Sequence, residues 1–262
     1  MELFGNDITL WILLALMVSA FAAGFIDSVA GGGGLILVPS FILAGLSPQL
    51  ALGQEKIVST LGTIAAIRNF VRNKKVVWTA VATGIPAGLV GAYVGAKAIL
   101  YFDPDTIGQI ILFMLPFGIV LSFIPKKNRE ENQTSSSSVI PLVIFIGVPV
   151  AVFTIGFYDG FFGPGTGSFL ILALHYLLKF DLVASSATSK MFNFSSNIGA
   201  LIAFMLAGNV LYLLAIPLVV MNVLGNHLGS SYAMKYGAKL IQRTISISLT
   251  LLMLSLGYKF LM

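Results

Sequence analysis

One stretch of this sequence occurs twice, and its composition limits what the chain can fold into. The first copy, GFIDSVAGGGG, covers residues 24–34, and the second, GFYDGFFGPGTGSF, covers residues 156–169. Each copy places an aspartate inside an apolar run and follows it with a glycine cluster. Because glycine weakens helices and permits sharp changes of backbone direction, each copy predicts an apolar helical segment that is interrupted.

Further features recur at nearly the same shift along the chain. The first glycine motif shifts by 132 residues, from position 24 to position 156, and Lys56 shifts by 134 residues to Lys190. The glycine pair 91/95 shifts by 134 residues to the pair 225/229. Three features in the same order and register indicate an internal duplication. We expect a first repeat at 1–125, a cytoplasmic linker at 126–138 and a second repeat at 139–262.

The composition is that of a membrane protein. Hydrophobic residues make up 57% of the chain and charged residues 10%, and the mean hydropathy is +0.96. Soluble domains carry about 25% charged residues. Apolar stretches near the length of about 20 residues that spans a bilayer follow one another throughout. The chain is therefore expected to be an all-α polytopic membrane protein with about 8–10 membrane segments.

Each half is divided into five apolar segments. They are residues 8–25, 35–46, 50–70, 77–99 and 106–124, and then 139–157, 168–178, 182–207, 210–232 and 241–260. The net charge of +5 is concentrated in loops, so it reports orientation rather than nucleic-acid binding. Placing the basic loops inside gives the halves opposite topologies, because five is odd. An inverted repeat with interrupted helices is typical of secondary transporters and predicts a multi-pass protein of the cell inner membrane.

The glycine clusters predict a site for a small anion. Backbone groups freed at a break cannot face lipid and must line a polar cavity or be buried in protein, and the helix that follows points its free N–H groups there. The candidate residues are Gly31, Gly32, Gly33, Gly34, Gly163, Gly165, Thr166 and Gly167. The alternative is that the glycines only allow close helix crossing, which we prefer for the pairs 84/88, 91/95 and 225/229.

Each half also carries a lysine early in its third apolar segment, followed by polar residues three and seven positions later. These spacings place the three side chains on one helical face, and a cation with neutral donors suits an oxyanion. The residues are Lys56, Ser59 and Thr63 in the first half and Lys190, Asn193 and Asn197 in the second. The alternative is a structural ion pair within each half, Lys56 with Asp27 and Lys190 with Asp159. Both roles are compatible if substrate competes for the lysine.

The aspartates have two interpretations. Asp27 and Asp159 could relay protons, as membrane carboxylates do, or could cap N–H groups freed at the breaks. His227 titrates near neutrality when unperturbed and is a further coupling candidate, although a packed polar role fits its glycine-rich surroundings. Glu55 has no acidic counterpart, since position 189 is serine, and we expect its role to be local.

Other chemistry is not indicated. The chain has no cysteine, only two histidines and no H-E-x-x-H motif, so we expect neither an enzyme nor a bound metal or cofactor. The expected partners are a small anionic substrate and the lipid bilayer, with no nucleic acid; homodimerisation is left open. A passive anion channel, or a transporter of another small anion such as a carboxylate, is the alternative to a secondary transporter.

These motifs resemble the TauE/SafE (sulfite exporter) family of membrane transporters, in particular its short members. The resemblance rests on both glycine motifs, on Lys56 and on the run at 187–197, and it covers nearly the whole chain. Family members often carry Thr-Asn-Lys where this chain has Gln54-Glu55-Lys56. The resemblance implies transport of small sulfur-containing anions such as sulfite, sulfonates or sulfoacetate, usually outward across the plasma membrane.

Overall fold

The computed structural model describes residues 8–122, 143–178 and 181–261. These ranges are almost entirely helical and contain no strand, which confirms the all-α class. The predicted linker at 126–138 lies outside the described residues.

The helices follow the expected apolar segments. In the first half they are α1 (Leu10–Ala30), α2 (Gly34–Leu43), α3 (Pro48–Arg72), α4 (Trp78–Ile99) and α5 (Pro104–Ser122). In the second half a π-helical turn (Val143–Gly147) precedes α6 (Val148–Phe161), α7 (Thr166–Leu178), α8 (Leu182–Leu206) and α9 (Tyr212–Leu261).

Local sequence sets several of the helix ends. Ser47 caps α3 ahead of Pro48, and Asp181 caps α8 by accepting from the N–H groups of Val183 (2.8 Å) and Ala184 (2.9 Å). Such caps satisfy donors that have no partner within the helix. Helix α1 ends where Gly31 takes a left-handed conformation with φ of 78°, which glycine adopts without steric cost.

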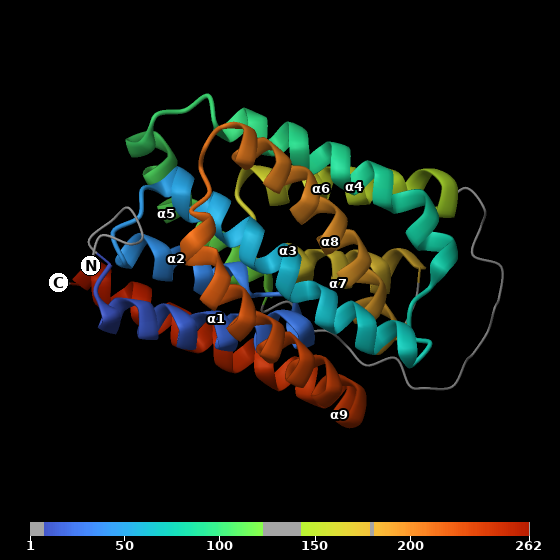
Figure 1. Ribbon diagram of the computed structural model, residues 1–262. Helices are drawn as coiled ribbons and strands as arrows, with labels where there is room; N and C mark the ends of the chain where they lie inside the picture. The colour runs from blue at the N-terminus through green and yellow to red at the C-terminus, as the bar shows by residue number, and fades with distance from the viewer. Residues whose placement is uncertain (1–7, 123–142, 179–180, 262) are drawn as a thin grey trace.

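Two expectations about the helices are wrong. The first break does not begin at Asp27, because α1 continues through it to Ala30 and the chain turns at Gly31–Gly33. The expected separate segments 210–232 and 241–260 are one continuous helix, α9, of 50 residues. Figure 1 shows α9 changing direction along its length, so that its red C-terminal end lies at the same end of the molecule as the start of α1.

Helices α3 and α8 lie at the centre of the molecule and contact each other (Figure 1). Every residue of α3 from Ala51 to Thr60 is buried, as is every residue of α8 from Ser185 to Lys190. Among the described residues four other stretches are long and apolar enough to cross a membrane: Leu10–Val29, Trp78–Ile99, Val143–Phe161 and Tyr212–Tyr236. The more polar central helices are therefore surrounded by apolar ones.

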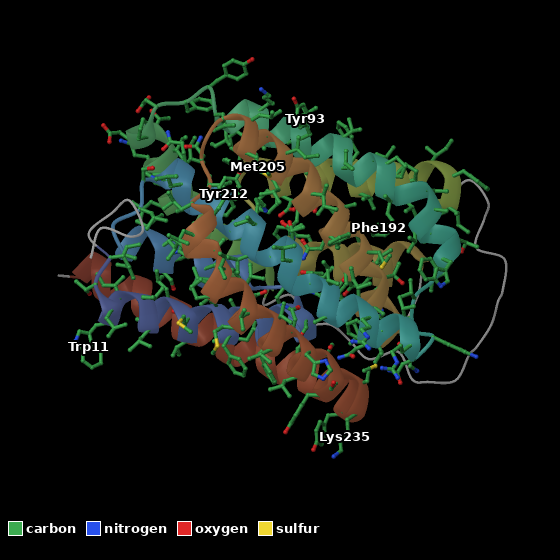
Figure 2. All side chains as sticks on the ribbon, viewed as in Figure 1. Trp11, Tyr93, Phe192, Met205, Tyr212 and Lys235 are labelled. Atoms are coloured by element: carbon green, nitrogen blue, oxygen red, sulfur yellow. The ribbon has the colours of Figure 1, made fainter. Side chains whose placement is uncertain are left out.

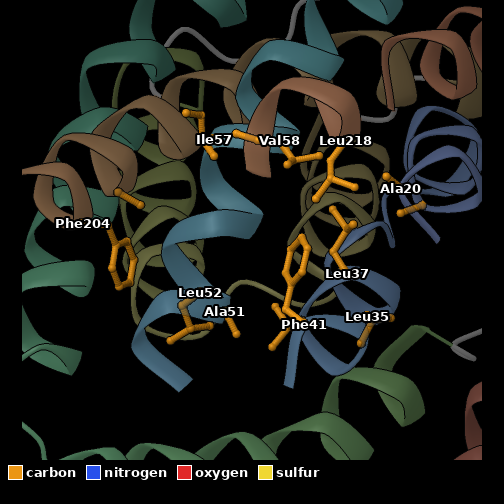
Figure 3. Packing of buried hydrophobic residues seen from close by; sticks show 14 of the residues in the cluster. Ala20, Leu35, Leu37, Phe41, Ala51, Leu52, Ile57, Val58, Phe204 and Leu218 are labelled. Atoms are coloured by element: carbon orange, nitrogen blue, oxygen red, sulfur yellow. The ribbon is translucent and has the colours of Figure 1, made fainter. Parts of the chain in front are cut away.

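The apolar core joins the first break to the central helices. Figure 3 shows Phe41 and Leu37 of α2 packed beside Val58 of α3 and Leu218 of α9. Large apolar side chains also cover the outside of the molecule, where Figure 2 shows Trp11 projecting from α1. An extensive apolar exterior is what a surface facing lipid tails requires.

Contacts between the halves recur at equivalent positions. A Cβ atom at Gly91 would meet the α6 backbone at Phe153 and Phe157, and a Cβ atom at Gly225 would meet the α1 backbone at Phe21 and Phe25. These glycines allow α4 to pack on α6 and α9 to pack on α1. The structure thus agrees with the packing interpretation of these glycine pairs.

Candidate functional site: two helix breaks and two buried lysines

The two glycine-rich breaks contact each other directly. The Ser168 N–H at the start of α7 donates to the Gly31 carbonyl at 3.0 Å. Cβ atoms built on Gly31 and Gly167 would each collide with the backbone of the other break. Glycine at both positions therefore lets two backbone turns from distant parts of the sequence meet inside the helical bundle.

Lys56 lies beside the second break, not the first. Its Nζ donates to Asp159 Oδ1 at 2.8 Å and to Asn197 Oδ1 at 3.2 Å, and it lies 3.0 Å from Glu55 Oε2. Ser196 of α8 donates to the other Asp159 oxygen at 2.6 Å. The lysine side chain is 1% exposed, so its charge is balanced entirely by protein groups in this structure.

Lys190 makes the corresponding contact at the first break. Its Nζ donates to Asp27 Oδ2 at 2.7 Å, and its side chain is fully buried. The other Asp27 oxygen accepts a long hydrogen bond, 3.5 Å, from the Gly33 N–H. Asp27 therefore both pairs with a lysine and partly caps a backbone donor freed by the break.

The ion pairs connect the two halves of the chain. The pairing expected within each half, Lys56 with Asp27 and Lys190 with Asp159, is wrong: each lysine reaches the aspartate of the other half. The physical reason is the packing of α3 against α8 at the centre, which brings each lysine to the opposite break.

Glu55 also belongs to this central cluster, so the expectation of a merely local role is wrong. Its carboxylate contacts Lys56, and Ser59 donates to its Oε1 atom at 2.7 Å. A Cβ atom on Gly34 would lie 3.5 Å from the same oxygen. Glu55 thus extends the site from the Lys56 pair to the first break.

The remaining candidates are polar side chains of α3 and α8 and residues of the two breaks. Asn193 joins the cluster, since its Oδ1 accepts from Asn197 at 3.4 Å, while Thr63 is buried and its hydroxyl has no hydrogen-bond partner. Thr166 donates to the Gly163 carbonyl at 2.6 Å and stabilises its own turn. In that turn Gly163 and Gly165 have φ of 93° and 90°. At the first break a Cβ on Gly32 would meet only side-chain atoms at 3.7 Å.

His227 is not part of the site. It is exposed, and it contacts Asn69, whose side-chain amide donates to the His227 carbonyl at 3.0 Å. Asn69 lies 13 positions from Lys56 on α3, about 20 Å along the helix. The histidine therefore ties α9 to the end of α3 and is too distant for direct contact with Lys56.

Sequence reasoning missed Ser196 and the partner choice of both lysines. Ser196 lies three positions after Asn193, so helical spacing places it near the same face and could have revealed it. The choice of aspartate depends on how α3 packs on α8, which periodicity within one segment does not encode.

These features define a polytopic helical membrane protein with a buried, charged site where two broken helices meet. Intramembrane charges are costly and are kept where they pair or serve transport. Residues 16–256 match the family described as "Sulfite exporter TauE/SafE". The chain belongs to this family and is a membrane transporter.

Similar proteins carry transporter names without a substrate. The chain is 36% identical over 240 residues to "Probable membrane transporter protein YfcA" of Escherichia coli K12, covering 90% of this chain and 86% of that protein. It is 37% identical over 246 residues to "Probable membrane transporter protein ORF9" of Sinorhizobium sp., covering 92% and 91%. It is 26% identical over 271 residues to YunE of Bacillus subtilis, covering 93% and 97%. No solved structure matches the chain.

Proposed function

We propose that this transporter moves small sulfur-containing oxyanions, such as sulfite or organosulfonates, out of the cell across the inner membrane. The observation that carries the proposal is the pair of buried lysines, each placed beside a helix break and held by a carboxylate. A bound oxyanion would take the place of a carboxylate oxygen, because both accept charge-assisted hydrogen bonds from an ammonium group. At the first break the Gly33 N–H, which now makes a long hydrogen bond of 3.5 Å to Asp27, would supply a further donor.

The proposed cycle is alternating access between two inverted repeats. The recurring contacts between the halves support a two-fold relation of this kind, as does the position of the broken helices at their interface. Since Lys56 and Lys190 are 1% and 0% exposed, the structure corresponds to a closed arrangement. An anion would reach them when one half moves against the other.

Uptake of sulfite and short alkylsulfonates into proteoliposomes tests this proposal. We expect saturable uptake that Lys56→Ala and Lys190→Ala each reduce at least tenfold, because a hydrogen bond to a charged group contributes about 1.5–3 kcal/mol. Lys97→Ala is the matched control, since Lys97 is an exposed cation near the end of α4. It should transport like the wild type.

The variant pair Lys190→Ala and Asp27→Asn separates binding from folding. Removing both charges leaves no unpaired ion, so the double variant should fold yet remain inactive. Normal uptake by this folded variant would show that the lysine is structural and that the proposed site is wrong. Large unitary currents in electrical recordings would favour a passive anion channel, and selective uptake of carboxylates would replace the sulfur assignment.

A further inference from the structure

The buried centre carries one carboxylate more than it has lysines. Among the described side chains it holds Lys56 and Lys190 with Asp27, Asp159 and Glu55. If all five are ionised, the cluster has a net charge of −1 in a region from which water is excluded. An uncompensated buried charge costs several kcal/mol, so one further positive charge would stabilise the cluster.

The contacts of the three carboxylates show which of them is compensated least. Asp159 accepts from Lys56 on one oxygen and from Ser196 on the other, and Asp27 has Lys190 to itself. Glu55 accepts from Ser59 on Oε1, and its Oε2 forms the longer of the two Lys56 ion pairs, with 3.0 Å between Oε2 and Nζ against 2.8 Å for Asp159. Lys56 is thus shared between two carboxylates, and Asp159 has the shorter contact.

We propose that Glu55 is a proton-binding site and that its proton is taken up together with the transported anion. Two carboxylates that share one lysine cannot both ionise freely, and Glu55 is the one with the longer contact to that lysine. Because it is 4% exposed, its proton would enter from water when the site opens on one side. The proton would leave to water when the site opens on the other side.

Few titratable groups other than Glu55 lie close enough to this cluster to bind the proton. From α3 itself it faces Lys56, and from α6 it faces Asp159. The other titratable groups on elements packed against α3 are Asp27 of α1, Lys190 of α8, the exposed Asp105 of α5, and Tyr212, His227, Tyr232, Lys235 and Tyr236 among the described side chains of α9; α2 has none.

Proton and anion should favour each other's binding. This step rests on the proposed function. An anion adds a negative charge to a cluster that already has an excess, and a proton on Glu55 removes one. Linkage is reciprocal, so the affinity for the anion should rise as the pH falls. Proton and anion would then move in the same direction. The direction of net flux would be set by the sum of the proton and anion gradients.

The extra carboxylate comes from Glu55 in the triplet Gln54-Glu55-Lys56. The second half has serine at the equivalent position 189. Glu55→Asn supplies a neutral residue in place of the carboxylate, and Glu55→Gln imitates the protonated side chain with almost the same shape. Both should remove proton linkage while keeping Lys56 and Asp159 paired.

Infrared titration of the purified protein tests the proton site without any substrate. We expect the wild type to show a protonated-carboxyl C=O band that grows as the pH is lowered from 8 to 5, shifts in D₂O and is absent in Glu55→Gln. Asp103→Asn is the control, because Asp103 is an exposed carboxylate whose pKa is lowered by hydrogen bonds from Thr106. An unchanged band in Glu55→Gln would overturn the proposal.

The pH dependence of transport tests the linkage to the anion. Methanesulfonate suits this assay because it stays ionised throughout the range. One linked proton changes the apparent affinity by about tenfold per pH unit, so we expect at least tenfold weaker half-saturation at pH 8 than at pH 6. In Glu55→Gln and Glu55→Asn the concentration for half-saturation should differ less than twofold between pH 6 and pH 8. Retained pH dependence in these variants, or a dependence on sodium in place of pH, would refute the inference. If the wild type transports none of these anions, the proposed function fails, whereas the infrared result still decides the proton site.

Discussion

Removing Lys190 alone should strongly destabilise the protein. Lys190→Met would leave Asp27 buried with only the long hydrogen bond from the Gly33 N–H. Breaking a buried ion pair on one side costs about 3–5 kcal/mol, whereas replacing both members by neutral groups is often nearly neutral. We therefore expect Lys190→Met with Asp27→Asn to recover most of the loss.

A double-mutant cycle distinguishes the crossed pairing from pairing within each half. Crossed pairing predicts a coupling free energy of about 2 kcal/mol or more between Lys190 and Asp27. Combining Lys190→Met with Asp159→Asn should instead give additive costs, within about 0.5 kcal/mol, as expected for groups that share no direct contact. The Lys190–Asp27 pair is preferred to the Lys56–Asp159 pair for this cycle. Lys56 also contacts Glu55, and this third charge would contribute to the measured coupling.

The cycle can be measured by unfolding each detergent-solubilised variant and following helix content by circular dichroism. Lys97→Met is the matched control, since it removes an exposed charge, and it should stay within about 0.5 kcal/mol of the wild type. Rescue of Lys190→Met by Asp159→Asn in place of Asp27→Asn would refute the crossed arrangement and restore the pairing expected within each half.

Four further substitutions test the packing of the helices and the role of His227. Gly225→Val would place its side chain against the α1 backbone and should cost about 1–3 kcal/mol or more in unfolding experiments, whereas Gly108→Ala, which meets one atom at 3.7 Å, should cost little. Gln54→Ala removes both hydrogen bonds to the Leu211 backbone and should cost about 1–3 kcal/mol by the same measurement. His227→Ala should change anion uptake less than twofold; a tenfold loss would return the histidine to the list of coupling groups.

Most helix positions could be predicted from the sequence because their signals are local. Apolar length, the Ser47-Pro48 start of α3 and the glycine clusters fix where α2 to α5, α7 and α8 begin and end to within a few residues, whereas α6 begins later than expected, at Val148, and continues through Asp159 to Phe161. The end of α1 was placed too early because an aspartate was read as the break, although Asp27 is a helical residue whose charge is compensated by Lys190. The division of α9 was expected from a basic cluster, but charge does not terminate a helix when no proline or capping residue accompanies it.

The site was predicted in its residues but not in its connections. Repetition singled out Lys56, Lys190 and both aspartates, because charged residues in apolar segments are conspicuous. Which carboxylate neutralises which lysine depends on the packing of α3 against α8, and sequence spacing carries no information about it. The repeat does not predict Glu55, because position 189 is serine, yet this asymmetry gives the cluster one carboxylate more than it has lysines.

The crossed ion pairs also bear on how an alternating-access cycle would be driven. Each pair joins residues of the first half to residues of the second, so a displacement of one half against the other stretches both pairs together. Separating two buried pairs without replacement would expose the protein to a cost of several kcal/mol for each ion. An oxyanion would replace a carboxylate as the partner of a separated lysine, and a proton on Glu55 would remove one negative charge from the cluster, so both would lower that cost. On this argument the carboxylates would hold the two halves together in the absence of substrate, and movement of the halves would become favourable only when the proposed anion and proton are both bound.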